Sequence, residues 1–410
     1  MVLFLFILFF LLIDWYFFQG ILVVSKNWTA GWKSGVRIGF WVPTVLCILA
    51  ICWWSFGDPY RVSANARNFI VTGIVATYFS KIIGLLVLFV DDLQRVVRWA
   101  VSFFYKGSNE SLPGAAIPRS EFLSKVALAT TAVPFTAFVY GIVSGAHDYR
   151  VKRLTIKLPN LPKSFDGIRI GQISDIHSGS FWNKTAVKGG VEMLLNEKPD
   201  VIMFTGDLVN NESTEVKDYI PIFEKLRAPM GVFSITGNHD YGDYKKWETP
   251  EAKQRNFNDL VQAHKVLGFD LLLNENRFLQ QGGDKLAILG VENWGVRFSK
   301  HGDLDRAYKG TEDAAVKLLL SHDPTHWDAQ VRPKYKDIDL MLAGHTHGFQ
   351  FGIKIGGMEW SPVQYVYKQW GGLYREDNQY IYVNRGFGYL GYPGRVGMPP
   401  ELTVIELKRA

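Results

Sequence analysis

The stretch Val232-Phe233-Ser234-Ile235-Thr236-Gly237-Asn238-His239-Asp240 joins a short apolar run to a cluster of polar side chains. Residues 232–236 are rich in β-branched and aromatic side chains, which is the pattern of a buried strand. Gly237 ends the run and starts a turn. The next three side chains offer an amide oxygen, an imidazole and a carboxylate. A buried strand that ends in such groups indicates an α/β domain with a site at the strand's carboxyl end.

The same pattern occurs four more times in the second half of the chain. The runs and the motifs that follow them are Ile168–Ile173 with Asp175-Ile176-His177, Val201–Thr205 with Gly206-Asp207, Lys317–Leu320 with Ser321-His322-Asp323, and Ile338–Ala343 with Gly344-His345-Thr346-His347. A helix-like segment, Asn183–Asn196, separates the first two runs. Strands that alternate with helical patterns indicate β-α-β units around a buried sheet. Ligand sites in such sheets lie beyond the strand ends, so the five motifs are expected to converge.

The side chains in these motifs suit the binding of two metal ions. Imidazole suits Zn, Fe and Mn, whereas carboxylate and amide oxygens suit harder ions. Two such ions clamp the attacking and leaving oxygens of a displacement at phosphorus and acidify a bound water. A single Asp-x-His is more often a solvated loop pair, and Gly-His-Thr-His alone also fits a mononuclear zinc site. The ordered set of five favours a two-metal centre, with Gly206, Gly237 and Gly344 allowing sharp turns.

The first 146 residues have a different character, because long apolar stretches dominate them. A membrane-spanning helix needs about 20 mostly apolar residues. Four stretches meet this requirement, namely Val2–Val24, Ile38–Phe56, Phe69–Val90 and Phe122–Val143. Residues 1–24 lack a basic start and a small-residue cleavage site, and further spans follow, so a cleavable signal peptide is not expected.

Two charged residues, Asp14 and Lys81, fall within the expected spans. A charge inside a bilayer is costly unless it faces the helix bundle or reaches the interface. The favoured interpretation is that both residues sit near helix ends, and the alternative is that they pair with each other.

The charge distribution fits a membrane protein better than a nucleic-acid binder. Residues 1–146 hold 11 Lys and Arg against six Asp and Glu, a balance of +5 out of the net +6 of the whole chain. The first and third loops between spans are richer in Lys and Arg than the second. This bias predicts that these loops are cytoplasmic, so that the N-terminus and the C-terminal domain lie outside. Arg150, Lys152, Arg153 and Lys157, after the fourth span, favour the opposite orientation. The only cysteines, Cys47 and Cys52, lie in an apolar stretch and give no disulfide framework.

Taken together, the motifs of residues 165–410 resemble the calcineurin-like metallophosphoesterase superfamily, most closely its membrane-associated bacterial branch. The strings Asn384-Arg385-Gly386-Phe387-Gly388, Pro393-Gly394-Arg395 and Pro399-Pro400-Glu401-Leu402-Thr403 also resemble that branch. The resemblance implies a four-layer α/β/β/α sandwich, preceded by an all-α transmembrane region of about four helices. The expected domains are the transmembrane region at 1–146, a linker with the first strand at 147–164, and the metallophosphoesterase domain at 165–410.

The resemblance also implies roles for single residues. The first metal would be held by Asp175, His177, Asp207 and His347, and the second by Asp207, Asn238, His322 and His345. His239 would donate a proton to the leaving-group oxygen or stabilise charge on the phosphoryl group. Asp240 would orient His239 through a hydrogen bond. The other four histidines, at 147, 264, 301 and 326, are expected at the surface or in local packing.

Two arginines and an aromatic stretch complete the candidate residues. Arg385 and Arg395 are candidates for phosphate contact, because a guanidinium binds phosphate through two parallel hydrogen bonds. A structural role at a turn is the alternative. The segment 358–374 holds Trp360, Tyr365, Tyr367, Trp370 and Tyr374, which fits a lid or a lipid-facing edge as well as ordinary packing.

The expected function is that of a membrane-anchored enzyme with two divalent metal ions, Mn, Fe or Zn. It would hydrolyse a phosphodiester or pyrophosphate bond in a lipid-linked or envelope substrate. The expected partners are the lipid bilayer and this phosphate ester, without nucleic acid, and the oligomeric state is open. The expected location is the cell's inner membrane, with the catalytic domain on the extracytoplasmic side. The alternatives are a metal-dependent phosphomonoesterase, or a non-catalytic sensor or transport protein with a metal-binding domain.

Overall fold

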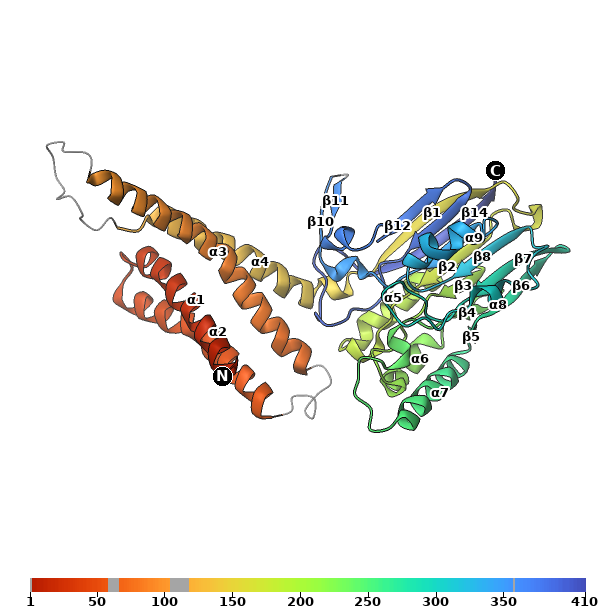
Figure 1. Cartoon of the computed structure of the whole chain (residues 1–410), viewed down its shortest axis with the longest axis horizontal. Helices are drawn as coiled ribbons and strands as arrows, with labels where there is room; N and C mark the ends of the chain where they lie inside the picture. The colour runs from red at the N-terminus through yellow and green to blue at the C-terminus, as the bar shows by residue number, and fades with distance from the viewer. Residues whose placement is uncertain (1, 58–65, 104–117, 357) are drawn as a thin grey trace. The chain divides into compact units, whose positions relative to one another are not determined.

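The computed structural model of the chain describes residues 2–57, 66–103, 118–356 and 358–410. The chain divides into two compact units, Met1–Tyr140 and Gly141–Ala410. Figure 1 labels the helices and strands of both units.

The first unit consists of long apolar helices. They are α1 (Val2–Val24), α2 (Ala30–Phe56), α3 (Ala66–Ser102) and α4 (Glu121–Val143), whose last residues belong to the second unit. All four are long and apolar enough to cross a membrane. The helices α2 and α3 extend beyond the predicted spans, because polar turns continue the helix past the apolar stretch. Most of their large apolar side chains are exposed, as expected for surfaces that lipid covers.

The interpretation that Asp14 and Lys81 sit near helix ends is wrong. Asp14 lies in the middle of α1, and its carboxylate accepts a hydrogen bond from the Lys81 ammonium on α3. Thr44 on α2 and Tyr78 on α3 also donate to Asp14, at 2.7 and 2.9 Å. Asp14 is fully buried and Lys81 nearly so. The two charges therefore pair inside the bundle, where an unpaired charge would be strongly unfavourable.

The second unit is built around two six-stranded sheets. The first sheet has the order β1 (Arg150–Leu158), β14 (Glu401–Arg409), β2 (Arg169–Ile173), β3 (Val201–Phe204), β4 (Val232–Ser234) and β5 (Asp270–Leu271). The second has the order β12 (Gly372–Glu376), β13 (Gln379–Val383), β9 (Leu340–Ala343), β8 (Val316–Leu320), β7 (Asp284–Gly290) and β6 (Glu275–Gln281). Strands β2 to β5 run parallel, as do β13, β9, β8 and β7. Each sheet thus contains the parallel β-α-β arrangement expected from the sequence.

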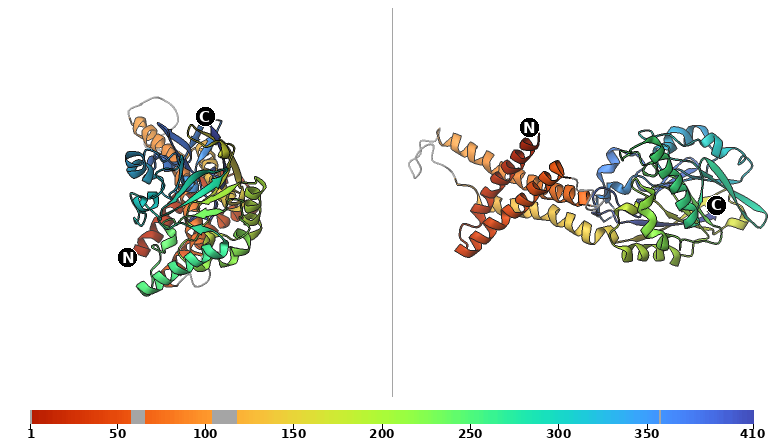
Figure 2. Two further views of the ribbon diagram at one scale, coloured as in Figure 1. Left: turned by 90° about the vertical axis from the view of Figure 1, so that its right-hand side faces the viewer. Right: turned by 90° about the horizontal axis from the view of Figure 1, so that it is seen from below.

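The sheets pack face to face over a shared apolar core. This core takes Met203 and Ile235 from the first sheet side and Leu318 and Leu342 from the second. On the outside, the first sheet is covered by α5 (Lys184–Asn196), α6 (Ile220–Phe223) and α7 (Pro250–Leu267). The second sheet is covered by α8 (Leu304–Tyr308) and the helical segment 327–334. These four layers, seen from two further directions in Figure 2, confirm the predicted α/β/β/α sandwich.

Helix α5 shows how local sequence sets these boundaries. Asn183 caps it, with its side-chain oxygen accepting a hydrogen bond from the Ala186 amide at 3.0 Å. Val187, Val191 and Leu194 recur at helical spacing and are buried against the first sheet. The predicted helix over residues 183–196 is therefore confirmed.

Register brings the motifs to one edge of the sandwich. Ile173 pairs with Phe204, and Phe204 pairs with Ser234, so β2, β3 and β4 end at the same level. In the second sheet Leu320 pairs with Leu342, which aligns the ends of β8 and β9. Because the motifs follow these strands directly, their side chains meet where the carboxyl ends of both sheets come together.

Candidate metal centre

The first group of candidate ligands joins one strand end from each sheet. Asp175 and His177 follow β2, and His347 follows β9. The Nε2 atoms of His177 and His347 lie 3.0 Å apart, and His347 Nε2 lies 3.2 Å from Asp175 Oδ1. All three side chains are buried. Two imidazole nitrogens at this distance need a shared proton or cation between them, because their lone pairs repel.

The second group lies beside the first and is connected to it through Asp207. It consists of Asp207 after β3, His322 after β8, and His345 after β9. Asp207 Oδ2 lies 3.0 Å from His322 Nε2 and 3.5 Å from His177 Nε2. One carboxylate oxygen of Asp207 therefore lies near an imidazole nitrogen of each group.

The backbone is left-handed at most of these positions. The φ angle is positive at Asp175 (51°), His177 (48°), Asp207 (59°), His345 (73°) and His347 (51°). Residues other than glycine adopt this region at a cost of about 1–3 kcal/mol each, and such residues gather at functional sites. The fold thus holds five of the seven candidate ligands in conformations that their own side chains disfavour.

The expected role of the glycines in sharp turns holds for Gly206, whose φ is +93°. Gly237 and Gly344 have a different role. A Cβ atom at Gly237 would lie 2.2 Å from Asp207 Oδ1, and one at Gly344 would lie 2.2 Å from Asp175 Oδ2. These two glycines are required by the space that the carboxylates occupy, rather than by a turn.

Asn238 has an open ligand atom. Its Nδ2 donates to the Tyr244 hydroxyl at 2.8 Å, whereas its buried Oδ1 has no hydrogen-bond partner among the described residues. A buried, unpaired amide oxygen is unfavourable, and a cation would relieve it. Together with the carboxylates and imidazoles, it completes a donor set that fits divalent metal ions such as Mn, Fe or Zn.

Burial and neighbouring charges shift the pKa values of several of these groups. Burial works to raise the pKa of Asp207, but the neighbouring His322 and His239 hold it well below its usual value. Burial lowers the pKa of His345 to about 4, and that of His177 falls well below its usual value for the same reason. For His322, burial is outweighed by the carboxylates of Asp207 and Asp175, which raise its pKa to about 10. Metal binding therefore has to displace a proton from His322.

His239 lies beside the two groups, but Asp240 does not orient it as expected. The ring of His239 is 5.0 Å from that of His177, centroid to centroid, and its Nδ1 lies 2.8 Å from the backbone carbonyl of Asn210. Asp240 instead accepts hydrogen bonds from the backbone amides of Asp207, Leu208, Val209 and Gly237. The orienting group of His239 is thus a main-chain carbonyl, and Asp240 fixes the loop that carries Asp207.

The two candidate phosphate-binding arginines are already held by protein groups. Arg395 is buried and donates to the carbonyls of Gly388, Arg385, Gly386 and Met398, with Nη2 3.2 Å from His347 Nδ1. Arg385 forms two hydrogen bonds to Glu359, at 2.7 and 2.8 Å. This arrangement favours a structural role for both arginines over the expected phosphate contact. Arg395 in particular positions the loop of His347.

Three residues near the site had no assigned role in the sequence. The hydroxyl of Tyr367 lies 2.9 Å from His345 Nε2. Phe298 packs against the His345 ring, with centroids 4.6 Å apart. Asp323 Oδ2 is buried and lies 3.7 Å from His345 Nε2. Tyr367 belongs to the aromatic stretch, and Asp323 follows His322 directly, so their positions in the sequence indicated that both lie near the site. No feature of the sequence indicated that Phe298 lies there.

The other histidines pack locally. His264 is buried beside Ser234, with Nδ1 3.0 Å from the Ser234 hydroxyl, and His326 is buried beside Ser321 at 2.8 Å. His301 stacks on Tyr241, and His147 contacts Trp182 edge to face.

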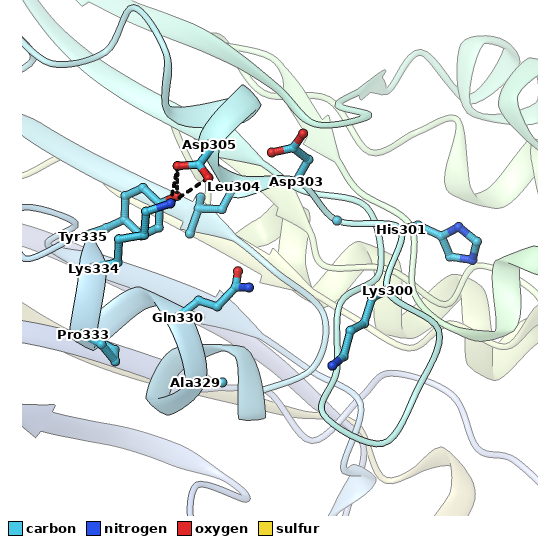
Figure 3. Close-up of a pocket in the computed structure, with 11 residues that line it drawn as sticks. Lys300, His301, Asp303, Leu304, Asp305, Ala329, Gln330, Pro333, Lys334 and Tyr335 are labelled. Carbon is cyan, nitrogen blue, oxygen red and sulfur yellow. Dashed lines mark hydrogen bonds and ion pairs between the residues drawn. The ribbon is translucent and has the colours of Figure 1, made fainter.

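Figure 3 shows residues that line a pocket, whose volume is about 440 Å³. It is lined by residues 300–305 and by residues of the helical segment on the outer face of the second sheet, and Asp305 pairs there with Lys334 and Tyr335. None of the candidate metal ligands lines it. Its position in the outer layer gives it no part in the chemistry of the metal centre.

The fold and the site define a class of protein, the metallophosphoesterases, with an α/β/β/α sandwich and paired His and Asp clusters at its edge. The chain belongs to the calcineurin-like phosphoesterase family. Residues 168–349 match the family "Calcineurin-like phosphoesterase", and residues 1–146 match "Probable Calcineurin-like phosphoesterase, transmembrane domain".

Three relatives illustrate the family. The chain is 32% identical over 301 residues to an uncharacterized metallophosphoesterase, YkuE, of Bacillus subtilis, a match that covers 71% of this chain and 97% of that protein. It is 29% identical to a transmembrane protein with metallophosphoesterase domain of Danio rerio, covering 66% of this chain and 60% of the relative. An uncharacterized metallophosphoesterase of Aquifex aeolicus is 28% identical, with 67% and 98% covered. The match thus spans three fifths of the Danio rerio protein.

Proposed function

We propose that this protein is a membrane-anchored phosphoester hydrolase with two divalent metal ions, Mn, Fe or Zn. The observation that carries the proposal is the placement of Asp207 Oδ2 between His322 at 3.0 Å and His177 at 3.5 Å. In this proposal Asp175, His177 and His347 hold one ion and Asn238, His322 and His345 hold the other. Asp207 would be a ligand of both.

The proposed chemistry divides between the ions and the protein. When bound, the ions supply Lewis-acid activation of the phosphoryl group and of water. His239 with a proton on both ring nitrogens gives the Nε2 proton to the leaving-group oxygen and becomes a neutral imidazole, while its Nδ1–H stays hydrogen-bonded to the Asn210 carbonyl and holds the ring in place. Asp240 keeps the Asp207 backbone in its left-handed conformation through the four amides that it binds.

The proposed substrate is a phosphodiester or pyrophosphate of a lipid-linked or envelope molecule. Four candidate spans in the same chain support this, because they concentrate the site at a bilayer. The proposed location is the inner membrane. The lysines and arginines of the first and third loops favour an extracytoplasmic catalytic domain.

Metal reconstitution of the full chain in detergent tests the proposal. The stripped protein would receive Mn²⁺, Zn²⁺, Fe²⁺ or Mg²⁺, and hydrolysis of a chromogenic phosphate diester would be compared with that of its monoester. We expect metal-dependent cleavage of the diester that His239→Ala and Asp207→Asn both abolish. Faster monoester cleavage would make the protein a phosphomonoesterase. No turnover by a folded, metal-loaded protein would argue against an enzyme that acts on water-soluble esters.

A further inference from the structure

Exposed apolar side chains are concentrated in one region of the second unit. Of the 13 large hydrophobic side chains exposed in the described part of residues 147–410, seven lie between residues 349 and 373. The most exposed are Ile355 (73%), Met358 (74%) and Tyr365 (76%). Scattered exposed apolar residues need no explanation, but a contiguous patch marks a surface that contacts a partner or a membrane.

Three of the seven, Ile353, Ile355 and Met358, lie on a two-stranded hairpin formed by β10 (Ile353–Ile355) and β11 (Met358–Trp360). Figure 1 shows these strands as an arm separate from both sheets of the sandwich. Ile353 pairs with Trp360, and Ile355 pairs with Met358. Because side chains alternate along a strand, these four residues share one face of the hairpin. The opposite face carries the Lys354–Glu359 pair.

The polar face of the hairpin is the one that the domain holds. Arg385 binds Glu359 through two hydrogen bonds, at 2.7 and 2.8 Å. Nearby, the Ser361 hydroxyl donates to the carbonyl of Gly348 at 2.8 Å. With Glu359 directed toward Arg385, the face with Ile355 and Met358 is directed away from the sandwich. A two-stranded hairpin with an apolar face in water is marginal by itself, so this face needs a covering.

The base of the hairpin lies next to the end of the last candidate span. That span reaches His147, and its residues from Gly141 onward belong to the second unit. The Gly141 carbonyl accepts a hydrogen bond from the Arg395 amide at 3.0 Å. The neighbouring Val396 pairs with residues 350–352, from which β10 begins. The hairpin therefore begins beside residues 141–147, the end of that candidate span.

We propose that the β10–β11 hairpin inserts its apolar face into the bilayer interface. Isoleucine and methionine would enter the acyl boundary, whereas Trp360 and Tyr365 are amphipathic rings that suit the headgroup level. Lys354 is exposed, and its long side chain reaches past the hairpin to complement anionic headgroups. The insertion itself does not depend on the proposed hydrolysis. Together with the proposed function, it would let a lipid-borne phosphate ester approach the His347 loop from the membrane surface.

Depth-dependent quenching of a fluorescent label tests the insertion. The full chain, with Cys47→Ala and Cys52→Ala, would carry a single labelled cysteine through Ile355→Cys. Vesicles would contain phosphatidylcholine and phosphatidylglycerol, with or without lipid that bears a nitroxide near its headgroup. We expect a blue-shifted emission that the nitroxide lipid quenches. The matched control is Val266→Cys on α7, which is exposed to a similar degree (58%) but lies in the outer layer of the sandwich. It should show neither effect.

The outcomes separate the bilayer from other coverings. Equal, weak quenching at both positions would overturn the proposal. A blue shift at Ile355→Cys that grows with protein density but is insensitive to nitroxide lipid would assign the face to a second copy instead. Hydrogen exchange of the natural chain gives an independent readout. The β10 amides of the chain in vesicles should exchange more slowly than the amides of an isolated two-stranded hairpin. Since neither readout measures hydrolysis, loss of the proposed activity would leave both results interpretable.

Discussion

Two buried clusters of charged side chains distinguish the halves of this molecule. In the helical unit, the carboxylate of Asp14 accepts hydrogen bonds from Lys81, Thr44 and Tyr78. In the sandwich, Asp207 faces two imidazole nitrogens, and Asn238 Oδ1 has no donor among the described residues. The first cluster neutralises itself, whereas the second gathers ligand atoms that repel one another unless a cation or proton joins them. Burial of charge alone therefore does not mark a functional site, but incomplete pairing does.

The largest expected effect comes from Asp207→Asn, which removes the proposed bridge. Metal activation is worth several kcal/mol, so we expect diester hydrolysis to fall about 10³-fold or more. The rise in Tm that metal gives the natural protein should shrink, because a ligand stabilises only the state that binds it. The matched change in the other cluster, Asp14→Asn, should leave hydrolysis per folded molecule unchanged. If Asp207→Asn kept both activity and metal-dependent stabilisation, the two-metal assignment would be wrong.

His239→Ala tests the next largest effect, the loss of proton donation without loss of metal. We expect hydrolysis to fall about 10²-fold, at the low end of what proton transfer contributes. Metal content, measured by elemental analysis, should stay that of the natural protein. The fall should be smallest for substrates with acidic leaving groups, since those need no proton. An equal fall for all leaving groups would assign His239 to stabilising the phosphoryl charge.

The helical cluster is tested by breaking its ion pair. Asp14→Leu leaves Lys81 buried without its partner, which should destabilise the bundle by about 3–5 kcal/mol. Lys81→Leu should have an effect of similar size. The double variant should recover much of the loss, because it buries two apolar groups in place of two charges. Thermal unfolding in detergent measures all three. Additive losses in the double variant would show that the pair does not act as one unit.

The smallest expected effect concerns a buried group that belongs to neither cluster. Burial lowers the pKa of His264 to about 3, so between pH 3 and about 6.5 the unfolded chain binds a proton that the folded chain does not. Its contribution to stability is complete above about pH 6.5 and is lost as the pH falls toward 3. The unfolding free energy of the metal-free protein should rise with pH over this range. His264→Gln should reduce this rise by up to about 1.4 kcal/mol per pH unit. An unchanged slope would contradict the assignment.

The sequence predicted the architecture and the meeting of the motifs, because both follow from local patterns. Apolar runs such as Val201–Thr205 identify strands, and parallel strands end at one edge whatever their side chains. The same reasoning brought Asp175 and His347 together, although 171 residues separate them along the chain. Their binding of metal stays a prediction.

Some features could not be predicted from the sequence. They depend either on backbone atoms, which every residue has, or on how two helices pack against each other. Every residue has a carbonyl, so nothing in the sequence distinguished Asn210 as the partner of His239. The pairing of Asp14 with Lys81 depends on the rotation of α1 against α3, which two isolated apolar stretches do not specify. The sequence leaves Arg395 between phosphate contact and a structural role, and its burial among backbone carbonyls favours the structural role.

The left-handed backbone at five candidate ligands has a consequence for the history of such proteins. Asp and His tolerate that conformation better than most side chains do, but glycine, which has no Cβ, accepts it more readily. As long as metal binding is selected, positions 175, 177, 207, 345 and 347 keep residues that strain the chain. A relative that no longer needs the metal would gain stability by drifting to glycine there. The residue types at these five positions in a relative would then indicate whether that protein still binds metal.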